Sequence, residues 1–476
     1  MENYSMYLGG EFVEGEEYLE VENPYTQEII ARIPDASVKH LDVCLKQAKL
    51  AQNEWENTKL SDRKSFLLDI AEIISSNLKK LAEIESVEIG KPIKETLLVD
   101  IPLASKVFEY YASLLDNFSN PYYLNDNELN MIYYQPFGVA GVLLPYNVPL
   151  MIFAFNVASA IAAGNAVIVK PSEFGSLSIL ELAKYIDKLD FPKGLINVIT
   201  GKGETIGSLL ASSNIDLISY TGSSKNLIKM FNSMKKPKKI INETSGINIA
   251  VVFSDAQIDE AVENIAASSF MKQGQICINT SICLVEEDIY DCFLKSFTEK
   301  INKIKIGDPL SPLTGMGPLR SKAHLIKTIE TVEKILQNGG KIIVGDTNVR
   351  DRENYFYMPT VIELGRLIYE ECFNPVLLIK SFKREDLKRY LEDNPTGLVL
   401  QIWTKDYDRA KKIALKAKYG NVWINTFAQM DSSIPFGGFK DSGWGRVLGK
   451  WGLYEYMQPK NIGIVFGKSK VSGWFS

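Results

Sequence analysis

The feature that most constrains the fold of this chain is a regular alternation of strand-like and helix-like segments between residues 164 and 242. Strands are expected at residues 165–170, 195–200, 217–220 and 239–242, and helices at 176–189, 203–211 and 223–234. Short apolar runs of this kind are typical of strands buried on both faces. Because a crossover between parallel strands is right-handed and carries a helix, the pattern predicts a doubly wound parallel sheet.

The sequence on either side continues the same α/β plan. Residues 6–35 predict a strand hairpin, 37–116 helices, 131–136 and 138–144 strands, and 148–163 a buried helix. A second alternating region covers 247–440, with strands at 249–253, 282–286 and 341–344, helices at 289–304 and 323–338, and a last strand at 461–466. The longest apolar run is shorter than the roughly 20 residues that span a bilayer, so no membrane segment is expected.

Size, charge and cysteine content exclude several classes of function. A chain of 476 residues is too long for one ordinary core and predicts two or three domains. A net charge of −5 offers no basic surface for nucleic acid and no polybasic membrane anchor. The N-terminus shows no secretory pattern, and five cysteines without paired metal-type spacing fit reduced thiols. A cytoplasmic protein is therefore expected.

Histidine is scarce in this chain. His40 and His324 are its two histidines, and both stand in lysine-rich helical contexts that predict a surface position. The scarcity argues against a histidine metal site or a histidine-based triad, and no metal is expected. A catalytic base must then be a carboxylate, a lysine or water.

Cys277 ends the segment 270–277, at a junction between a helix-like run and a strand. A thiol near a helix end can face a cleft, where its thiolate character is tunable. An isolated cysteine is more often a small buried hydrophobe. The flanking residues alone leave both interpretations open.

Polar residues follow several of the predicted strands. Asn147 lies in a Pro-Tyr-Asn-Val-Pro turn, Glu243 directly follows a strand, and Lys170 and Glu173 follow another. Open α/β sheets bind ligands at the carboxyl ends of their strands, so these side chains are expected to share one cleft.

The usual G-x-G-x-x-G dinucleotide fingerprint is absent from the sequence. In its place, Gly201-Lys202-Gly203 follows one strand and Thr221-Gly222-Ser223-Ser224 follows the next. The second stretch puts a glycine and hydroxyls at a helix N-terminus, where free N–H groups and the helix dipole suit phosphate.

Together these residues stand in stretches that resemble the aldehyde dehydrogenase superfamily, over nearly the whole chain. The matching stretches are residues 145–149, 164–173, 220–223, 243–246, 274–277, 371–376 and 435–438. Cys277 also follows Glu243 by 34 positions, a spacing similar to the family's. The resemblance implies an α/β fold with a Rossmann-like cofactor domain, an α/β catalytic domain and a small β oligomerisation flap.

The implied boundaries divide the chain as follows. The cofactor domain takes residues 1–119 and 137–245, with 443–456 returning to it; the catalytic domain takes 246–442; the flap takes 120–136 and 457–476. Because an isolated two-stranded hairpin is marginally stable, the flap is expected to pair across subunits of a homodimer or homotetramer.

The resemblance also assigns catalytic roles. Cys277 would attack an aldehyde carbon to give a thiohemiacetal, and Asn147 with the Cys277 backbone N–H would form the oxyanion hole. After hydride transfer, Glu243 would activate the water that hydrolyses the thioester. A buried Glu243 would have a raised pKa, which suits a base working near neutral pH.

Cofactor contacts are implied for a further set of residues. They are Lys170, Ser172, Glu173, Gly203, Gly222, Ser223, Thr244, Glu371 and Phe373. A carboxylate at Glu173 accepts hydrogen bonds from a ribose 2′-OH and repels a 2′-phosphate, so NAD is expected over NADP. NADP stays possible, since Lys202 or Lys225 could accept the phosphate.

Four departures from the family pattern stand beside these motifs. Tyr146 replaces a frequent Trp, Thr244-Ser245 replace a Leu-Gly pair, and Asn374 replaces the usual glycine. Lys272 occupies a position that is often Asn. Its charge could lower the pKa of Cys277, attract an acidic substrate, or face solvent.

The substrate is expected to be a small, uncharged, hydrophobic aldehyde, aromatic or aliphatic, because the projected pocket is apolar and holds no arginine. The pocket residues are Val148, Ile152, Phe155, Met271, Ile276 and Ile278. The alternatives are a semialdehyde dehydrogenase with an acidic substrate or a CoA-acylating reaction, and a non-catalytic binding protein of the same fold. A base at Glu243 argues against CoA acylation, which needs no activated water.

Overall fold

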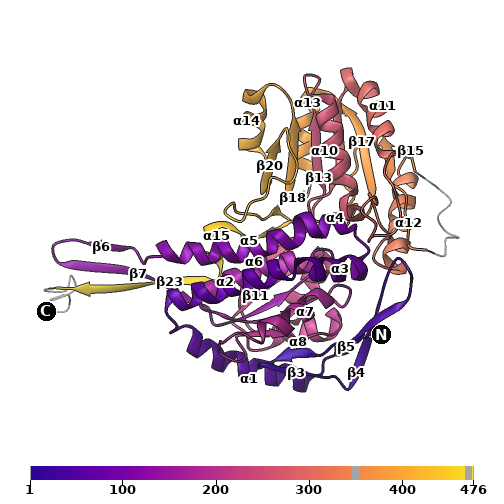
Figure 1. Cartoon of the computed structure of the whole chain (residues 1–476). Helices are drawn as coiled ribbons and strands as arrows, with labels where there is room; N and C mark the ends of the chain where they lie inside the picture. The colour runs from indigo at the N-terminus through magenta and orange to yellow at the C-terminus, as the bar shows by residue number, and fades with distance from the viewer. Residues whose placement is uncertain (1, 346–353, 467–473, 475–476) are drawn as a thin grey trace.

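The computed structural model describes residues 2–345, 354–466 and 474. Figure 1 shows a lower lobe that carries the N-terminal half, an upper lobe built from the later residues, and an arm of strands that projects to one side. Each of these parts is organised around a sheet of its own.

In the described part of the chain, the first sheet has eight strands in the order β22-β12-β11-β8-β9-β10-β2-β3. Its parallel strands are β8 (Val139–Leu143), β9 (Ala166–Lys170), β10 (Ile196–Val198), β11 (Leu217–Gly222) and β12 (Lys239–Thr244). At one end of the sheet β2 (Met6–Leu8) pairs antiparallel with β10 and the edge strand β3 (Glu11–Val13) pairs antiparallel with β2; at the other end the edge strand β22 (Gly443–Trp444) pairs antiparallel with β12. The predicted doubly wound sheet is confirmed, and its strand order reverses between β8 and β11, where such sheets bind ligands.

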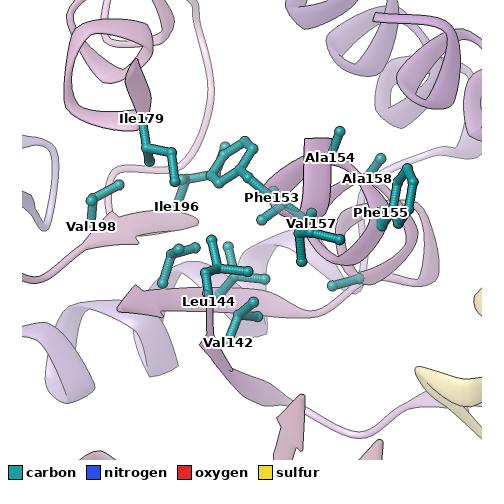
Figure 2. Close-up of a cluster of buried hydrophobic side chains, with 14 of the residues drawn as sticks. Val142, Leu144, Phe153, Ala154, Phe155, Val157, Ala158, Ile179, Ile196 and Val198 are labelled. Carbon is teal, nitrogen blue, oxygen red and sulfur yellow. The ribbon is translucent and has the colours of Figure 1, made fainter. Parts of the chain in front are cut away.

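Helices cover this sheet and give it a large core. They are α1 (Val38–Trp55), α2 (Leu60–Ser76), α3 (Leu78–Ile89), α4 (Ile93–Glu95), η1 (Thr96–Asp100), α5 (Ile101–Leu114), η2 (Leu115–Asn117), α6 (Pro149–Ala163), α7 (Leu177–Ile186), η3 (Gly203–Gly207), α8 (Ser208–Ser212), α9 (Ser224–Ser233) and α15 (Gly449–Glu455). Figure 2 shows Phe153 and Val157 of α6 in one apolar cluster with Leu144 and Ile196.

Helix α6 is buried along its whole length. Pro149 stands at its first turn, where a missing N–H costs nothing, and Gly164 ends it with a φ of +98°. The helix starts directly after the turn that carries Asn147. Its rigid packing therefore fixes that turn at the carboxyl end of β8.

The second sheet, within the described residues, has seven strands in the order β15-β16-β17-β14-β13-β19-β20. They are β13 (Asn248–Val252), β14 (Thr280–Glu286), β15 (Gly340–Val344), β16 (Thr360–Leu364), β17 (Val376–Phe382), β19 (Val399–Trp403) and β20 (Asn421–Ile424), all parallel except β15. Its helices are α10 (Ile258–Phe270), η4 (Met271–Gly274), η5 (Glu287–Ile289), α11 (Tyr290–Ile301), α12 (Lys322–Gln337), α13 (Arg384–Asp393) and α14 (Tyr407–Lys416). A two-stranded pair, β18 (Thr396–Gly397) with β21 (Phe439–Lys440), lies beside it.

The projecting arm is a three-stranded antiparallel sheet among the described residues. Strand β7 (Glu128–Pro136) pairs with β6 (Tyr122–Leu124) on one side and with β23 (Met457–Val465) on the other. The predicted tail strand at 461–466 therefore belongs to a longer strand with a distant partner. The rest of the predicted flap, beyond residue 466, lies outside the described residues except for Trp474.

Two elements differ from the sequence prediction. The expected helix at 203–211 is a wide π-helical turn, η3, followed by the short α8, because glycines at both ends of η3 weaken a regular helix. The expected single hairpin at 6–35 is two: β2 with β3, and β4 (Glu17–Glu22) with β5 (Ile29–Asp35), the latter joined by β1 (Glu2–Asn3). None of the described helices is long and apolar enough to cross a membrane.

Candidate active site

A cavity of about 460 Å³ opens at the carboxyl ends of β8 and β11 and reaches residues of both large sheets. Three predicted catalytic residues line it: Asn147, Glu243 and Cys277. All nine predicted cofactor residues line it as well: Lys170, Ser172, Glu173, Gly203, Gly222, Ser223, Thr244, Glu371 and Phe373. The fold thus brings together side chains that are spread over more than 200 residues of sequence.

Asn147 lies in the turn between β8 and α6 and is buried. Its backbone carbonyl accepts a hydrogen bond of 3.1 Å from the Nζ of Lys91, which stands 56 positions earlier in the sequence. The turn is thus held from behind while Asn147 lines the cavity.

Cys277 follows a tight turn at the end of α10. Lys272, Gln273 and Gly274 have φ angles of +52°, +58° and +67°. A Cβ at Gly274 would lie 2.1 Å from the carbonyl oxygen of Asn374, so the turn requires glycine there. This sharp turn brings the thiol to the cavity instead of letting α10 continue.

The surroundings of the Cys277 thiol favour its protonated form. Burial and the nearby Glu243 carboxylate raise the pKa of Cys277 to about 12. The carbonyl of Cys277 accepts a hydrogen bond of 2.8 Å from the side-chain amide of Asn248 at the start of β13. The thiol is therefore held in place, and its nucleophilic form needs added positive charge or a base.

Glu243 stands near the end of β12 with its carboxyl group in the cavity wall. Among the described residues, neither of its carboxyl oxygens has a hydrogen-bond partner. Burial raises the pKa of Glu243 well above its ordinary value, although the charge of Arg446 opposes the shift. A Cβ at Gly437 would lie 2.7 Å from Oε1, so that glycine leaves room for the carboxyl group. A buried, unpaired carboxyl beside a thiol matches a general base.

Lys170 and Glu173 form one ion pair on the other side of the cavity, 3.1 Å from Nζ to Oε2. Burial by itself raises the pKa of Glu173, but the Lys170 ammonium outweighs it and holds the pKa below its ordinary range. The backbone N–H of Gly203 also donates to Glu173, at 3.4 Å. Glu173 is thus an anionic acceptor at this end of the cavity.

Ser223 and Asn226 at the N-terminus of α9 line the same cavity. The Ser223 hydroxyl caps this helix by accepting from the backbone N–H of Asn226 at 3.3 Å. The phenol of Tyr220 donates to the carbonyl of Ser223 at 2.9 Å, which fixes the turn from below. A helix N-terminus with a nearby hydroxyl is a site for a phosphate group.

Glu371 and Phe373 come from the segment before β17 and lie on the opposite wall. The Ser245 hydroxyl donates a hydrogen bond to Oε1 of Glu371. The Phe373 ring lies 6.4 Å from the Tyr146 ring in an edge-to-face arrangement. Asn374, which replaces a usual glycine, also lines the cavity, and its buried Oδ1 has no partner among the described groups.

His324 corrects the expectation of a surface histidine. Its ring lies 4.8 Å from that of Tyr146, and it lines the cavity with Lys327, Thr328 and Thr331 from one face of α12. Burial and the charge of Arg320 lower the pKa of His324 to about 4, so the ring is neutral at pH 7. Lys327, Thr328 and Thr331 follow His324 by three, four and seven positions, so the four side chains share one helix face. This spacing is the sequence signal that could have placed His324 with the other three.

Three projected pocket residues are not brought to this cavity. Val148, Ile152 and Phe155 line it, but Met271, Ile276 and Ile278 do not. Ile276 and Ile278 are buried in the core of the first lobe. Neighbouring residues in a turn point in different directions, so the thiol of Cys277 faces the cavity while its two neighbours pack away from it.

Lys272 also departs from its three expected roles. Its side chain is buried, does not line the cavity, and forms an ion pair with Asp100 at 2.8 Å. It therefore neither faces solvent nor meets a substrate, and it is not among the groups that shift the pKa of Cys277, which is raised.

The residues present fit a dinucleotide. The Glu173 carboxylate, Ser223 at the start of α9 and the Glu371 carboxyl all line one cavity, and their chemistry suits a ribose, a phosphate and a second ribose. The unpartnered Oδ1 of Asn374 adds an acceptor at the end next to Phe373. The thiol of Cys277 and the carboxyl of Glu243 line the same cavity.

Comparisons with known proteins agree with this geometry. A family model described as "Aldehyde dehydrogenase family" matches residues 12–462. The chain is 34% identical to a betaine aldehyde dehydrogenase of Bacillus subtilis over 96% of each chain. It is 33% identical to a 2-aminomuconic semialdehyde dehydrogenase of Mus musculus over 97% of this chain and 98% of that one. Among solved structures, PnpE from Pseudomonas sp. WBC-3 matches with a TM-score of 0.94 and 30% identity over 98% of this chain and 99% of PnpE. A structure of PnpE in complex with nicotinamide adenine dinucleotide matches with the same TM-score.

Proposed function

Because this chain belongs to the aldehyde dehydrogenase family, we propose that it oxidises an uncharged, hydrophobic aldehyde to the carboxylic acid, with NAD preferred as the hydride acceptor. The observation that carries the hydrolytic form of this reaction is the buried Glu243 carboxyl, unpartnered among the described residues and lining the same cavity as Cys277.

The first step is attack by the Cys277 sulfur on the carbonyl carbon of the aldehyde. A bound dinucleotide would supply a positively charged ring, which favours the thiolate, and an acceptor for the hydride. The C–S bond forms as the C=O double bond opens to an oxyanion. The Asn147 amide and the Cys277 backbone N–H stabilise this oxyanion, and each such donor contributes about 3–4 kcal/mol in comparable sites. The hydride leaves the substrate carbon, with its C–H bond breaking, when the oxyanion returns to a C=O bond and so gives the thioester.

The second step hydrolyses the thioester left on Cys277. Glu243 takes a proton from water, whose oxygen attacks the thioester carbon. The C–S bond then breaks, which releases the carboxylic acid and returns the thiolate. The raised pKa of Glu243 suits a base that accepts a proton near neutral pH.

A CoA-acylating reaction is the second candidate. It would pass the acyl group to a thiol and would have no use for a water-activating carboxyl at Glu243. Turnover of the aldehyde with NAD, followed at 340 nm with and without CoA, separates the two. Full activity without CoA, with free acid as the product, supports hydrolysis; strict dependence on CoA contradicts it.

The preference for NAD rests on Glu173. The carboxylate is held ionised by Lys170 at 3.1 Å and would accept hydrogen bonds from a ribose 2′-OH. A 2′-phosphate there would meet a negative charge. A higher kcat/KM with NADP than with NAD would refute this assignment.

The preference for an uncharged substrate rests on the apolar part of the lining of the cavity that Cys277 shares. Its members include Val148, Ile152, Phe155, Leu398, Phe436 and Val447. No arginine lines the cavity in the described part of the chain. The two relatives are named for a betaine aldehyde and a semialdehyde, so the decisive comparison is benzaldehyde against betaine aldehyde and succinic semialdehyde. A strong preference for either charged substrate would refute the proposal.

The arm of β6, β7 and β23 is proposed as the oligomerisation flap. It exposes Tyr122, Tyr123, Leu124, Ile464 and Val465. Exposed apolar side chains on a thin sheet favour cover by a second subunit, which supports a homodimer or homotetramer. The proposal also includes the domain boundaries expected from the sequence. Light scattering after size-exclusion chromatography tests it, and a monomer at micromolar concentration would contradict it.

A further inference from the structure

The buried Lys272 has no part in the chemistry proposed above, yet it stands five positions before Cys277. Its side chain is 3% exposed, and it does not line the cavity. Long charged side chains are almost never buried without a partner, so its surroundings have to explain it.

Lys272 has two buried carboxylate partners: Glu95, 3.9 Å from its Nζ, and the nearer Asp100, which bridges two ammonium groups. Nζ of Lys272 lies 2.8 Å from Oδ1 of Asp100, and Nζ of Lys91 lies 2.7 Å from Oδ2. All three side chains are buried. Asp100 therefore joins the turn before Cys277 to a lysine on a different segment of the chain.

Lys91 continues this link to the other catalytic element. Its ammonium also donates to Oε1 of Glu85 at 2.5 Å and to the carbonyl of Asn147 at 3.1 Å. An ammonium has three donors, and here all three are used. Glu85 in turn accepts from the backbone N–H of Leu150 in the first turn of α6, at 3.4 Å. The backbone around Asn147 is thus held at two points.

The turn that carries Lys272 needs such support. Lys272 and Gln273 both have left-handed backbone angles, which are unfavourable for residues with a side chain. The backbone N–H of Lys272 donates to the Glu95 carboxyl at 3.1–3.2 Å, and the Gln273 amide donates to the carbonyl of Gly90 at 2.6 Å. Strained conformations of this kind persist where the surrounding structure over-determines them.

We propose that Lys272 is a positioning residue: the buried chain Lys272–Asp100–Lys91 fixes the Cys277 turn relative to Asn147. The thiol that attacks and the amide that receives the oxyanion come from different lobes, and this chain joins them behind the cavity wall. The inference rests on the proposed roles of Cys277 and Asn147. Stability alone is a poor reason for such a chain, because a buried ion pair stabilises little more than an apolar replacement of similar volume.

The first test variant is Lys272→Met, which keeps an unbranched side chain, one atom shorter, and removes its charge. We expect kcat/KM for the aldehyde to fall by about 10- to 100-fold, the size of loss that a displacement near 1 Å produces. The Kd for NAD, measured by fluorescence quenching, should stay unchanged. The rate of Cys277 alkylation by iodoacetamide, which uses no oxyanion hole, should also stay unchanged.

A charge-balanced double variant guards against loss of folding. Lys272→Met leaves three carboxylates, Glu85, Glu95 and Asp100, with one ammonium. Lys272→Met combined with Asp100→Asn leaves two carboxylates with one ammonium, which restores the balance of the unchanged protein. If Lys272 acts through Asp100, the double variant loses no more activity than the worse single variant. If Lys272→Met does not fold, the test is the comparison of kcat/KM between the double variant and Asp100→Asn, which should be equal if Lys272 acts through Asp100.

A matched control separates positioning from general loss of stability. Arg63 on α2 is also buried and donates to the carbonyls of Trp55, Glu56 and Ala162, away from the cavity. Arg63→Met should lower the melting temperature and leave kcat/KM at 25 °C unchanged.

Three results would overturn the positioning role. The first is an equal loss of kcat/KM in Arg63→Met and Lys272→Met when their melting temperatures are equal. The others are a fold-loss in the double variant equal to the product of the two single fold-losses, and a rate of Cys277 alkylation that falls as much as kcat/KM. A failure of the proposed function would be recognised by a different result, because the Cys277→Ala variant would then still oxidise the aldehyde.

Discussion

Replacing Glu243 by glutamine tests the assigned base at the point where the structure is most specific. The change keeps the size of the side chain, and it breaks no hydrogen bond, since the described groups offer none to either carboxyl oxygen. Activity should therefore change through chemistry and not through packing. The amide cannot accept a proton from water, so hydrolysis of the thioester should slow while its formation continues.

The size of the effect follows from what a general base contributes, about 10²- to 10⁴-fold, or roughly 2.7–5.5 kcal/mol of barrier. In stopped-flow measurements at 340 nm, Glu243→Gln should give a burst of NADH close to one equivalent per active site. A steady state slower by about 10²- to 10⁴-fold should follow. Mass spectrometry should find the acyl group on Cys277.

Stability gives an independent readout of the same substitution. The pKa of Glu243 is raised in the folded protein by burial, so its contribution to stability is present below its unfolded pKa and is lost as pH rises toward its folded pKa. Glutamine stays neutral at every pH. Glu243→Gln should therefore melt higher than the unchanged protein at pH 8 and equally at pH 4.

The control is Glu263→Gln on α10, which makes the same chemical change at an exposed ion pair with Lys300. It should alter neither the burst nor the steady state. A Glu243→Gln enzyme with an unchanged steady state and no burst would refute the assignment of Glu243 as the base for hydrolysis.

Four further outcomes follow from described contacts. Glu173→Gln should raise kcat/KM for NADP and lower it for NAD, because it removes the negative charge that repels a 2′-phosphate; an unchanged ratio would move the discriminating group elsewhere. Alkylation of Cys277 in the cofactor-free enzyme should rise about tenfold per pH unit from pH 7 to 9, since burial and Glu243 raise the thiol pKa to about 12; a plateau below pH 8 would contradict that environment. Gly274→Ala should reduce kcat/KM by about 100-fold, because its Cβ would meet the carbonyl of Asn374 at 2.1 Å and displace the turn; near-normal turnover would show that the turn adapts. Ile464→Asp should shift the oligomer toward monomer in light scattering with the cavity intact, as measured by NAD binding; an unchanged mass would remove the arm from the interface.

The sequence was sufficient for the parallel sheet and for the residues at its carboxyl edge. Apolar strands and helical segments alternate strictly there, so Asn147, Lys170 and Glu243 each fall at the end of a strand, and the fold brings them to one cavity. The position of each of these residues is set locally, because it depends only on the strand that the residue follows and on the direction that parallel neighbouring strands share.

Other parts of the site depend on contacts that no local pattern contains. His324 lies on a lysine-rich helix, and its place against Tyr146 follows from the packing of the two lobes. Ile276 and Ile278 were projected into the pocket because they flank Cys277, but both are buried in the core of the first lobe, and only Cys277 of the three lines the cavity. The carboxylate partners of Lys272, Asp100 and Glu95, are 172 and 177 residues away in sequence, so these ion pairs were not predictable from spacing.

The position of β22 has a consequence for how the protein is made. Strand β12, which carries Glu243, lies at the edge of the first sheet until β22 pairs with it, and β22 is about 200 residues further along the chain. At a synthesis rate of about 5–20 residues per second, this edge stays open on the ribosome for roughly 10–40 s. An unpaired strand edge is a template for association with other chains. The strand that holds the assigned base is thus among the last of its sheet to be protected, and nascent chains that stop before residue 443 should need a chaperone to stay monomeric.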